Sequence, residues 1–105
     1  MKTFLNKKTE ITQIDDKEKK TNLGYADLCL LCVRSAKEGG FGVEEMRKRF
    51  RLIDALDGIK DNAVVKLEDA DAALLDEIMQ GFRWAVLHKD IIALTDHVHN
   101  LETVK

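Results

Sequence analysis

Two cysteines are the residues best suited to covalent or metal chemistry, yet their surroundings argue against both uses. Cys29 and Cys32 have the C-x-x-C spacing of redox pairs and of half a zinc site. They lie in the apolar run from Leu28 to Val33, whereas reactive pairs usually sit at a turn or helix start. No second cysteine or histidine pair has ligand spacing. We therefore expect two buried core thiols, no metal ion and no other cofactor.

Histidines and acidic residues offer no metal site either. His97 and His99 are two residues apart, so their rings would diverge by about 200° on a helix. The acidic run 68–71 lacks the glycine and the terminal glutamate of a calcium loop, and it fits a helix start instead. Ser35, the only serine, falls within a predicted helix. The sequence therefore contains no catalytic constellation, and we expect a protein that is not an enzyme.

Large apolar and aromatic side chains point to binding of another protein. Leu30 and Leu31 extend the apolar surface of the helix predicted over residues 25–37 beyond half of its circumference. Phe82 and Trp84 flank Arg83, and Trp and Arg are residue types that carry much of the energy of protein interfaces. These five residues are the candidate partner-binding residues. The competing interpretation is that the helix is central in the core and that Phe82 and Trp84 both pack there.

Basic residues in the next predicted helix, residues 43–57, suggest an alternative. Arg47, Lys48 and Arg51 could contact nucleic acid if this helix and the preceding one formed a helix-turn-helix. Acidic residues lie about one turn away on either side, within reach of i,i+3 and i,i+4 pairing. A solvated, internally paired face is the competing interpretation.

The positions of apolar residues and glycines predict four helices, over residues 25–37, 43–57, 69–80 and about 88–101. The last of these could instead run unbroken from Phe82. Residues 64–67 read as a short strand or extended link. In the second helix we expect one buried stripe, formed by Val43, Met46, Phe50, Ile53 and Leu56.

The N-terminal segment has too little apolar surface to offset the entropy of ordering. Residues 1–22 are therefore expected to form a flexible polar arm, with at most a short edge strand at residues 11–14. Residues 23–102 would form one helical domain. The predicted fold class is thus mainly α: a small four-helix domain with one short extended segment and a flexible arm.

Composition limits the partners and the compartment. The net charge is −2, with a basic excess in residues 1–60 and an acidic excess after them, so overall charge does not indicate nucleic acid. No stretch is long enough to span a membrane, and no signal peptide is recognisable. Free buried thiols fit a reducing compartment, so we expect a cytoplasmic location without a membrane partner.

Three stretches together resemble small proteins encoded by phages and prophages. They are residues 45–56 (EMRKRFRLIDAL), 65–71 (VKLEDAD) and 81–84 (GFRW), and the resemblance covers roughly residues 43–99. It implies a role in virion morphogenesis or in binding a host factor, and it implies no catalytic residues. The location would then be the host cytoplasm.

These observations converge on one functional expectation. The chain should be a non-enzymatic protein–protein interaction domain that docks an apolar helical face on itself or on another protein, in particle assembly or on a host factor. The alternative is the helix-turn-helix-type nucleic-acid-binding regulator that uses the basic residues of the second helix.

Overall fold

The computed structural model describes residues 2–14, 20–35, 39–84 and 87–101. Its helices are α1 (Tyr25–Arg34), α2 (Val43–Leu56), α3 (Asp69–Gly81) and α4 (Lys89–His99). Its strands are β1 (Lys2–Leu5), β2 (Lys8–Ile14), β3 (Lys20–Gly24) and β4 (Val64–Leu67). Among the described residues, no helix combines the length and apolarity needed to cross a membrane.

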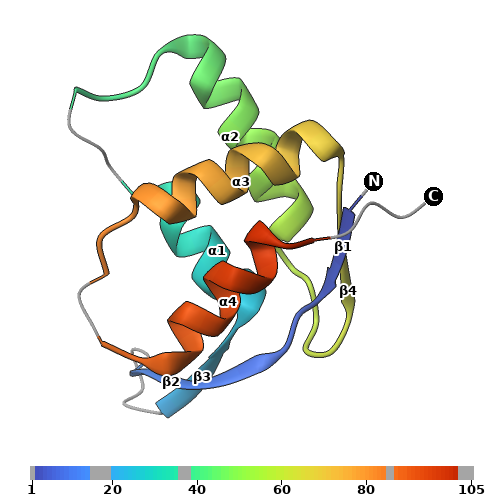
Figure 1. Ribbon diagram of the computed structural model, residues 1–105, viewed down its shortest axis with the longest axis vertical. Helices are drawn as coiled ribbons and strands as arrows, with labels where there is room; N and C mark the ends of the chain where they lie inside the picture. The colour runs from blue at the N-terminus through green and yellow to red at the C-terminus, as the bar shows by residue number, and fades with distance from the viewer. Residues whose placement is uncertain (1, 15–19, 36–38, 85–86, 102–105) are drawn as a thin grey trace.

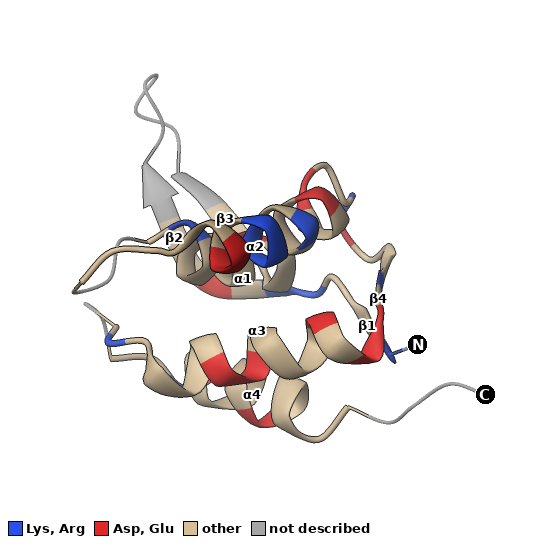
Figure 2. Ribbon diagram, turned by 90° about the horizontal axis from the view of Figure 1, so that it is seen from above, with Lys and Arg blue, Asp and Glu red and all other residues tan. Residues whose placement is uncertain are grey.

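The helices form two layers. α1 and α2 lie in one layer and α3 and α4 in the other, as Figures 1 and 2 show from two directions. The β1–β4 sheet lies at one side of these layers, and the β2–β3 sheet lies beside the starts of α1 and α4 (Figure 1). At the end of α2, Gly58 has a φ of +72°, the left-handed conformation that commonly ends helices and that favours glycine.

Both sheets are antiparallel and two-stranded. β1 pairs with β4 so that Phe4 lies opposite Val65, and both side chains are buried. β2 pairs with β3 as neighbours in sequence, with an irregularity in register between Lys8 and Thr12. The side of β4 that carries Val65 and Leu67 faces the core, while Val64 and Lys66 are exposed.

The fold class predicted from the sequence is wrong. The molecule is mainly helical, and the four predicted helices and the strand at 64–67 are present. However, the N-terminal region expected to be a flexible arm contributes β1, β2 and most of β3, so the fold is mixed α and β. The prediction failed because β1 is stabilised by pairing with a strand about sixty residues away, which local composition cannot reveal.

Asn6 joins three parts of the chain. Its side chain is buried, and Nδ2 donates to the carbonyl oxygens of Ile59 at 3.0 Å and Lys60 at 3.2 Å. Its Oδ1 accepts a hydrogen bond of 2.9 Å from the backbone N–H of Ala26 in the first turn of α1. We call Asn6 and these three partners the Asn6 junction. Its hydrogen bonds hold the connection between β1 and β2 against the start of α1 and against the loop before β4.

Gly24 leaves room for this junction. A Cβ atom at Gly24 would lie 2.6 Å from the Oδ1 atom of Asn6, closer than such contacts occur in proteins. The backbone N–H of Gly24 also donates to the Asp27 carboxylate at 2.9 Å, which caps the start of α1. Glycine is thus required here by close packing.

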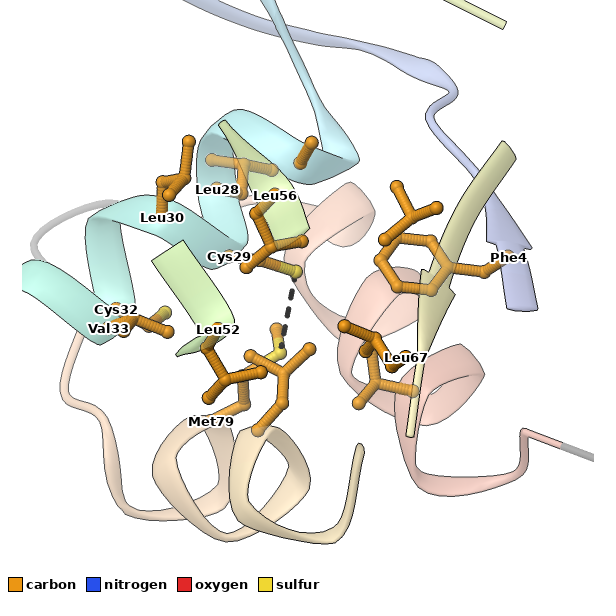
Figure 3. Close-up of a cluster of buried hydrophobic side chains, with 14 of the residues drawn as sticks. Phe4, Leu28, Cys29, Leu30, Cys32, Val33, Leu52, Leu56, Leu67 and Met79 are labelled. Carbon is orange, nitrogen blue, oxygen red and sulfur yellow. Dashed lines mark hydrogen bonds between the residues drawn. The ribbon is translucent and has the colours of Figure 1, made fainter. Parts of the chain in front are cut away.

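The core lies between the two helical layers. All four helices contribute side chains that are at most 1 % exposed: Leu28, Cys29, Leu52, Leu75 and Leu94. Figure 3 shows Cys29 and Met79 approaching each other from opposite layers, with 4.0 Å between their sulfur atoms. The prediction that both cysteines are buried, free thiols is confirmed.

The buried side of α2 differs from the predicted stripe. Leu52 and Leu56 are fully buried and Ile53 is half-buried, but Val43, Met46 and Phe50 are exposed. The helix carries apolar residues on two sides, and periodicity alone assigned the wrong one to the core. The contacts of α2 with α1, α3 and β4 select the side of Leu52.

Candidate interaction surface

The exposed side of α2 carries three large apolar side chains. Val43, Met46 and Phe50 are 64 %, 42 % and 62 % exposed. They stand at positions i, i+3 and i+7 of one helix, so they share one face. We call these three residues the α2 apolar face. Clustered apolar side chains on a surface mark sites of interaction, whereas single ones are ordinary.

Other large exposed apolar residues do not form a comparable group. Leu5 and Val64 are cross-strand partners in the β1–β4 sheet and can cover each other. Leu31, Leu87 and Ile92 lie singly on α1, on the segment before α4 and on α4. The α2 apolar face is therefore the principal cluster of this kind among the described residues.

Charged groups border the α2 apolar face. Arg47 lies 3.7 Å from Glu44 one turn earlier, and both side chains are largely exposed. Asp54, one turn after Phe50, is exposed and forms no ion pair with any residue that the structure describes. A weakly held cation thus lies beside the middle of the face, and a free carboxylate lies one turn beyond its Phe50 end.

The residues predicted to bind a partner are divided between core and surface. Leu30 is buried and belongs to the core, so it forms no part of a docking surface. Leu31 is exposed, without another large apolar side chain on its helix face. Phe82 and Trp84 are half-buried and pack edge to face, with ring centroids 4.8 Å apart, while Arg83 is exposed. Residues 82–84 are not helical, so α4 does not run unbroken from Phe82.

An open groove of about 720 Å³ runs between α2 and α3 on the other side of α2 from Phe50. Phe82 and Arg83 line it together with Lys48, so it combines members of both predicted sites. A second hollow of about 320 Å³ shares Lys48, Leu74 and Glu77 with it. The walls of the larger groove are mixed: α2 contributes both basic and acidic residues and α3 an acidic one, beside apolar side chains, and Figure 2 shows these charges on the two helices.

Ion pairs hold most of the basic residues of α2. Arg51 contacts Asp71 of α3 at 3.1 Å. Arg49 contacts Glu45 at 2.9 Å, donates to the Val33 carbonyl at 2.9 Å and lies over the Phe41 ring. Lys48 alone among the cations of α2 has no ion pair within the described part of the chain.

The segment between α1 and α2 also bears on the nucleic-acid alternative. It covers residues 35–42, and a helix-turn-helix uses a turn of about three or four residues. Together with the pairing of Arg47 and Arg51, this length means that no observed feature favours nucleic-acid binding over protein binding.

Glu10, His88 and Asp90 approach each other closely enough to be compared with a metal site. However, the Asp90 carboxylate accepts a 2.9 Å hydrogen bond from the Glu10 backbone N–H, and His88 Nδ1 accepts one of 3.1 Å from the Asp90 N–H. These groups cap the start of α4, where the helix dipole disfavours a cation. The cluster is explained as the attachment of α4 to β2, a contact that the sequence did not indicate.

The cysteines are unsuited to nucleophilic chemistry. Burial raises the pKa of the Cys32 thiol to about 12, and burial, together with the nearby Cys32, raises the pKa of Cys29 further. The thiolate is the nucleophilic form, and it is therefore disfavoured at both positions near neutral pH.

Comparison with protein-family models, with curated proteins and with solved structures found no match for this chain. Sequence reasoning overlooked the α2 apolar face because it counted these residues as core. A signal was present, since Leu52 lies about 160° around the helix from Phe50 and gives α2 a second apolar side.

Proposed function

We propose that this chain is a non-enzymatic protein-interaction domain that docks its α2 apolar face on another polypeptide. The single observation that supports the proposal most strongly is the shared exposure of Val43, Met46 and Phe50 on one helix face. A helix with anchors at i, i+3 and i+7 is a common recognition element for a protein groove or a second helix.

The energetics agree with a docking role. Complete burial of a Val, Met or Phe side chain is worth roughly 1.5–3 kcal/mol, so burying the remaining exposed parts of three such residues supplies several kcal/mol. Phe50 is the natural anchor, because it is the largest of the three and lies beside Arg47 and Asp54, which can add polar contacts at the rim.

The proposed setting is the cytoplasm, where the free thiols Cys29 and Cys32 would remain reduced. If the resemblance to phage and prophage proteins reflects common ancestry, the partner would be a component of particle assembly or a host factor. The α2 apolar face replaces Leu30 and the Phe82–Trp84 pair as the proposed contact.

Site-specific photo-crosslinking in the cells that naturally contain this protein tests the proposal. A photoreactive phenylalanine analogue at Met46 should give a discrete adduct with a second polypeptide. The same analogue at Ile92 is the matched control, because Ile92 is also an exposed apolar helical residue but lies on α4. Adducts no stronger from Met46 than from Ile92 would refute the interaction through α2.

A further inference from the structure

We propose that the partner of the α2 apolar face is the same face of a second copy of this chain, with the two α2 helices antiparallel. This inference rests on the proposed function and names its partner. Phe50, Met46, Arg47 and Asp54 lie around and along α2 in positions that match this arrangement.

Phe50 lies at the centre of the exposed side of α2. At about 100° per residue, Val43 and Met46 point within about 40° of the direction of Phe50, whereas the buried Leu52 points about 160° away. Because α2 runs from Val43 to Leu56, the residues up to four positions before and after Phe50 are all helical. A two-fold axis beside Phe50 would place the two Phe50 rings against each other.

This two-fold axis reverses the direction of the second helix. A residue before Phe50 in one copy therefore lies opposite a residue after Phe50 in the other copy. Arg47, three positions before, and Asp54, four positions after, both point to the same flank, about 60° and 40° from Phe50. In the antiparallel pair, Arg47 of one copy and Asp54 of the other then differ by about 1.5 Å in position along the helix axis, which is one helical rise. Arg47 of each copy therefore meets Asp54 of the other, which gives two symmetric ion pairs.

The opposite flank is apolar. Met46, four positions before Phe50, meets Ile53, three positions after it in the second copy, and Ile53 is only half-buried in the single chain. Each flank of this helix face therefore matches the same flank of the face in the second copy. A parallel arrangement would instead place the Arg47 and Asp54 flank of one copy beside the Met46 and Ile53 flank of the other, so the charges would face apolar side chains, and the antiparallel arrangement is favoured.

Both charges are available for this pairing. Within the described part of the chain, Asp54 has no ion pair, and the one ion pair of Arg47 is with the exposed Glu44 at 3.7 Å. By contrast, Arg51 is paired with Asp71 and points toward α3. The antiparallel pair thus uses the free carboxylate Asp54 and the weakly held Arg47, whereas the unpaired Lys48 points about 160° away from Phe50.

The size of the surface sets the strength of the association. A helix of 14 residues is about 21 Å long, and two such helices side by side bury less than the roughly 800 Å² per partner of a standard stable interface. The dimer should therefore be weak and should form in the micromolar range of concentration.

Light scattering on purified protein, over roughly 10 µM to 1 mM, measures this association. The mass should rise from one chain toward two as the concentration increases. Phe50→Glu should weaken association by roughly 30-fold or more, as for an interface hot spot. Ile92→Glu is the control: Ile92 and Phe50 are each 62 % exposed, so this variant should associate like the wild type.

Charge reversal tests the antiparallel arrangement. Arg47→Asp and Asp54→Arg should each weaken association by about tenfold, because each creates two like-charge contacts. The double variant Arg47→Asp/Asp54→Arg should regain most of the wild-type affinity. Failure of the double variant to recover would overturn the antiparallel pairing.

The result also separates this inference from the function on which it depends. A mass of one chain at every concentration would refute self-association. If Met46 still gave a crosslink to a different polypeptide in cells, the interaction function would stand and only its partner would change. If neither association nor a crosslink were found, both proposals would fail.

Discussion

The Asn6 junction and the α2 apolar face reverse the usual distribution of side chains. Asn6 is a polar residue only 2 % exposed, and Phe50 is a large aromatic residue that remains 62 % exposed. Buried polar groups and exposed apolar clusters are the departures that carry information, because apolar burial and polar exposure are expected everywhere.

The difference lies in what each region is bonded to. The Asn6 side chain makes three hydrogen bonds to backbone groups from two distant segments, so its polar atoms are fully used within the chain. Val43, Met46 and Phe50 leave much of their surface without protein neighbours. The first region therefore contributes to folding, and the second remains available for a partner.

The largest predicted effect is at the junction. Asn6→Ala should lower the free energy of unfolding by about 3–5 kcal/mol, because it removes three hydrogen bonds and leaves the buried N–H of Ala26 and the partly buried carbonyl of Ile59 unpaired, at roughly 1–3 kcal/mol each. Urea denaturation followed by circular dichroism measures the loss. Asn22→Ala, at an exposed position of β3, is the control and should change stability by less than about 0.5 kcal/mol. Equal effects of the two variants would remove the distinction between junction and surface.

A second prediction compares the two sides of α2. Leu52→Ala should cost about 2–5 kcal/mol, because Leu52 is completely buried and its truncation leaves a cavity. Phe50→Ala, two residues away, should cost less than about 0.5 kcal/mol at concentrations where the chain is monomeric. The same denaturation experiment measures both variants. A large loss for Phe50→Ala would mean that this ring stabilises the monomer.

Gly24 allows the junction to be probed from its other side. Gly24→Ala should cost about 1–3 kcal/mol, since the new Cβ atom would displace the Asn6 side chain. In the double variant Asn6→Ala/Gly24→Ala the obstructing amide is absent, so the combined loss should be smaller than the sum of the two single losses. Additive losses would show that the two residues act independently.

The smallest effect concerns the Cys32 thiol, whose charged form is disfavoured by burial. The Cys32 thiol loses its proton near pH 9.0 in the unfolded chain but near pH 12 in the folded one. Ionisation of this thiol therefore lowers the free energy of unfolding as the pH rises above about 9, and has little effect at lower pH. The loss from this thiol is about 1 kcal/mol between pH 9 and pH 10. Cys29 and Tyr25, whose pKa values burial also raises, contribute in the same direction.

Denaturation at pH 8, 9 and 10 measures this dependence. Cys32→Ala removes only one titrating group, so the difference in slope between this variant and the wild type isolates the contribution of Cys32. Parallel slopes for the two proteins would contradict the assigned pKa shift.

Helices and their approximate limits could be predicted from local patterns. The spacing of Leu75 and Met79, for example, follows from helical periodicity, and the glycine at position 58 indicates the end of α2. Strands β1 and β2 were assigned to a flexible arm, because the energy that orders Phe4 comes from Val65 and other distant residues. Such long-range pairing leaves little trace in composition.

The candidate surface was missed for a related reason. Periodicity identifies an apolar side of a helix, but neighbouring elements decide whether that side is covered. Val43, Met46 and Phe50 satisfied the pattern and were assigned to the core, while Leu52 provided the side that packs. Likewise, Leu30 was a candidate for contact with a partner, and packing of α1 against its neighbours buries it.

The pairing of β1 with β4 has a consequence for synthesis of the protein. Residues 2–5 leave the ribosome about sixty residues before residues 64–67, which at roughly 5–20 residues per second corresponds to several seconds. During this interval β1 has no partner strand and Asn6 cannot reach the carbonyls of Ile59 and Lys60. α1 and α2 can form on the nascent chain during this interval, whereas the N-terminal strand can pair only once β4 has emerged, so until then its edge is open to chaperones and to other chains.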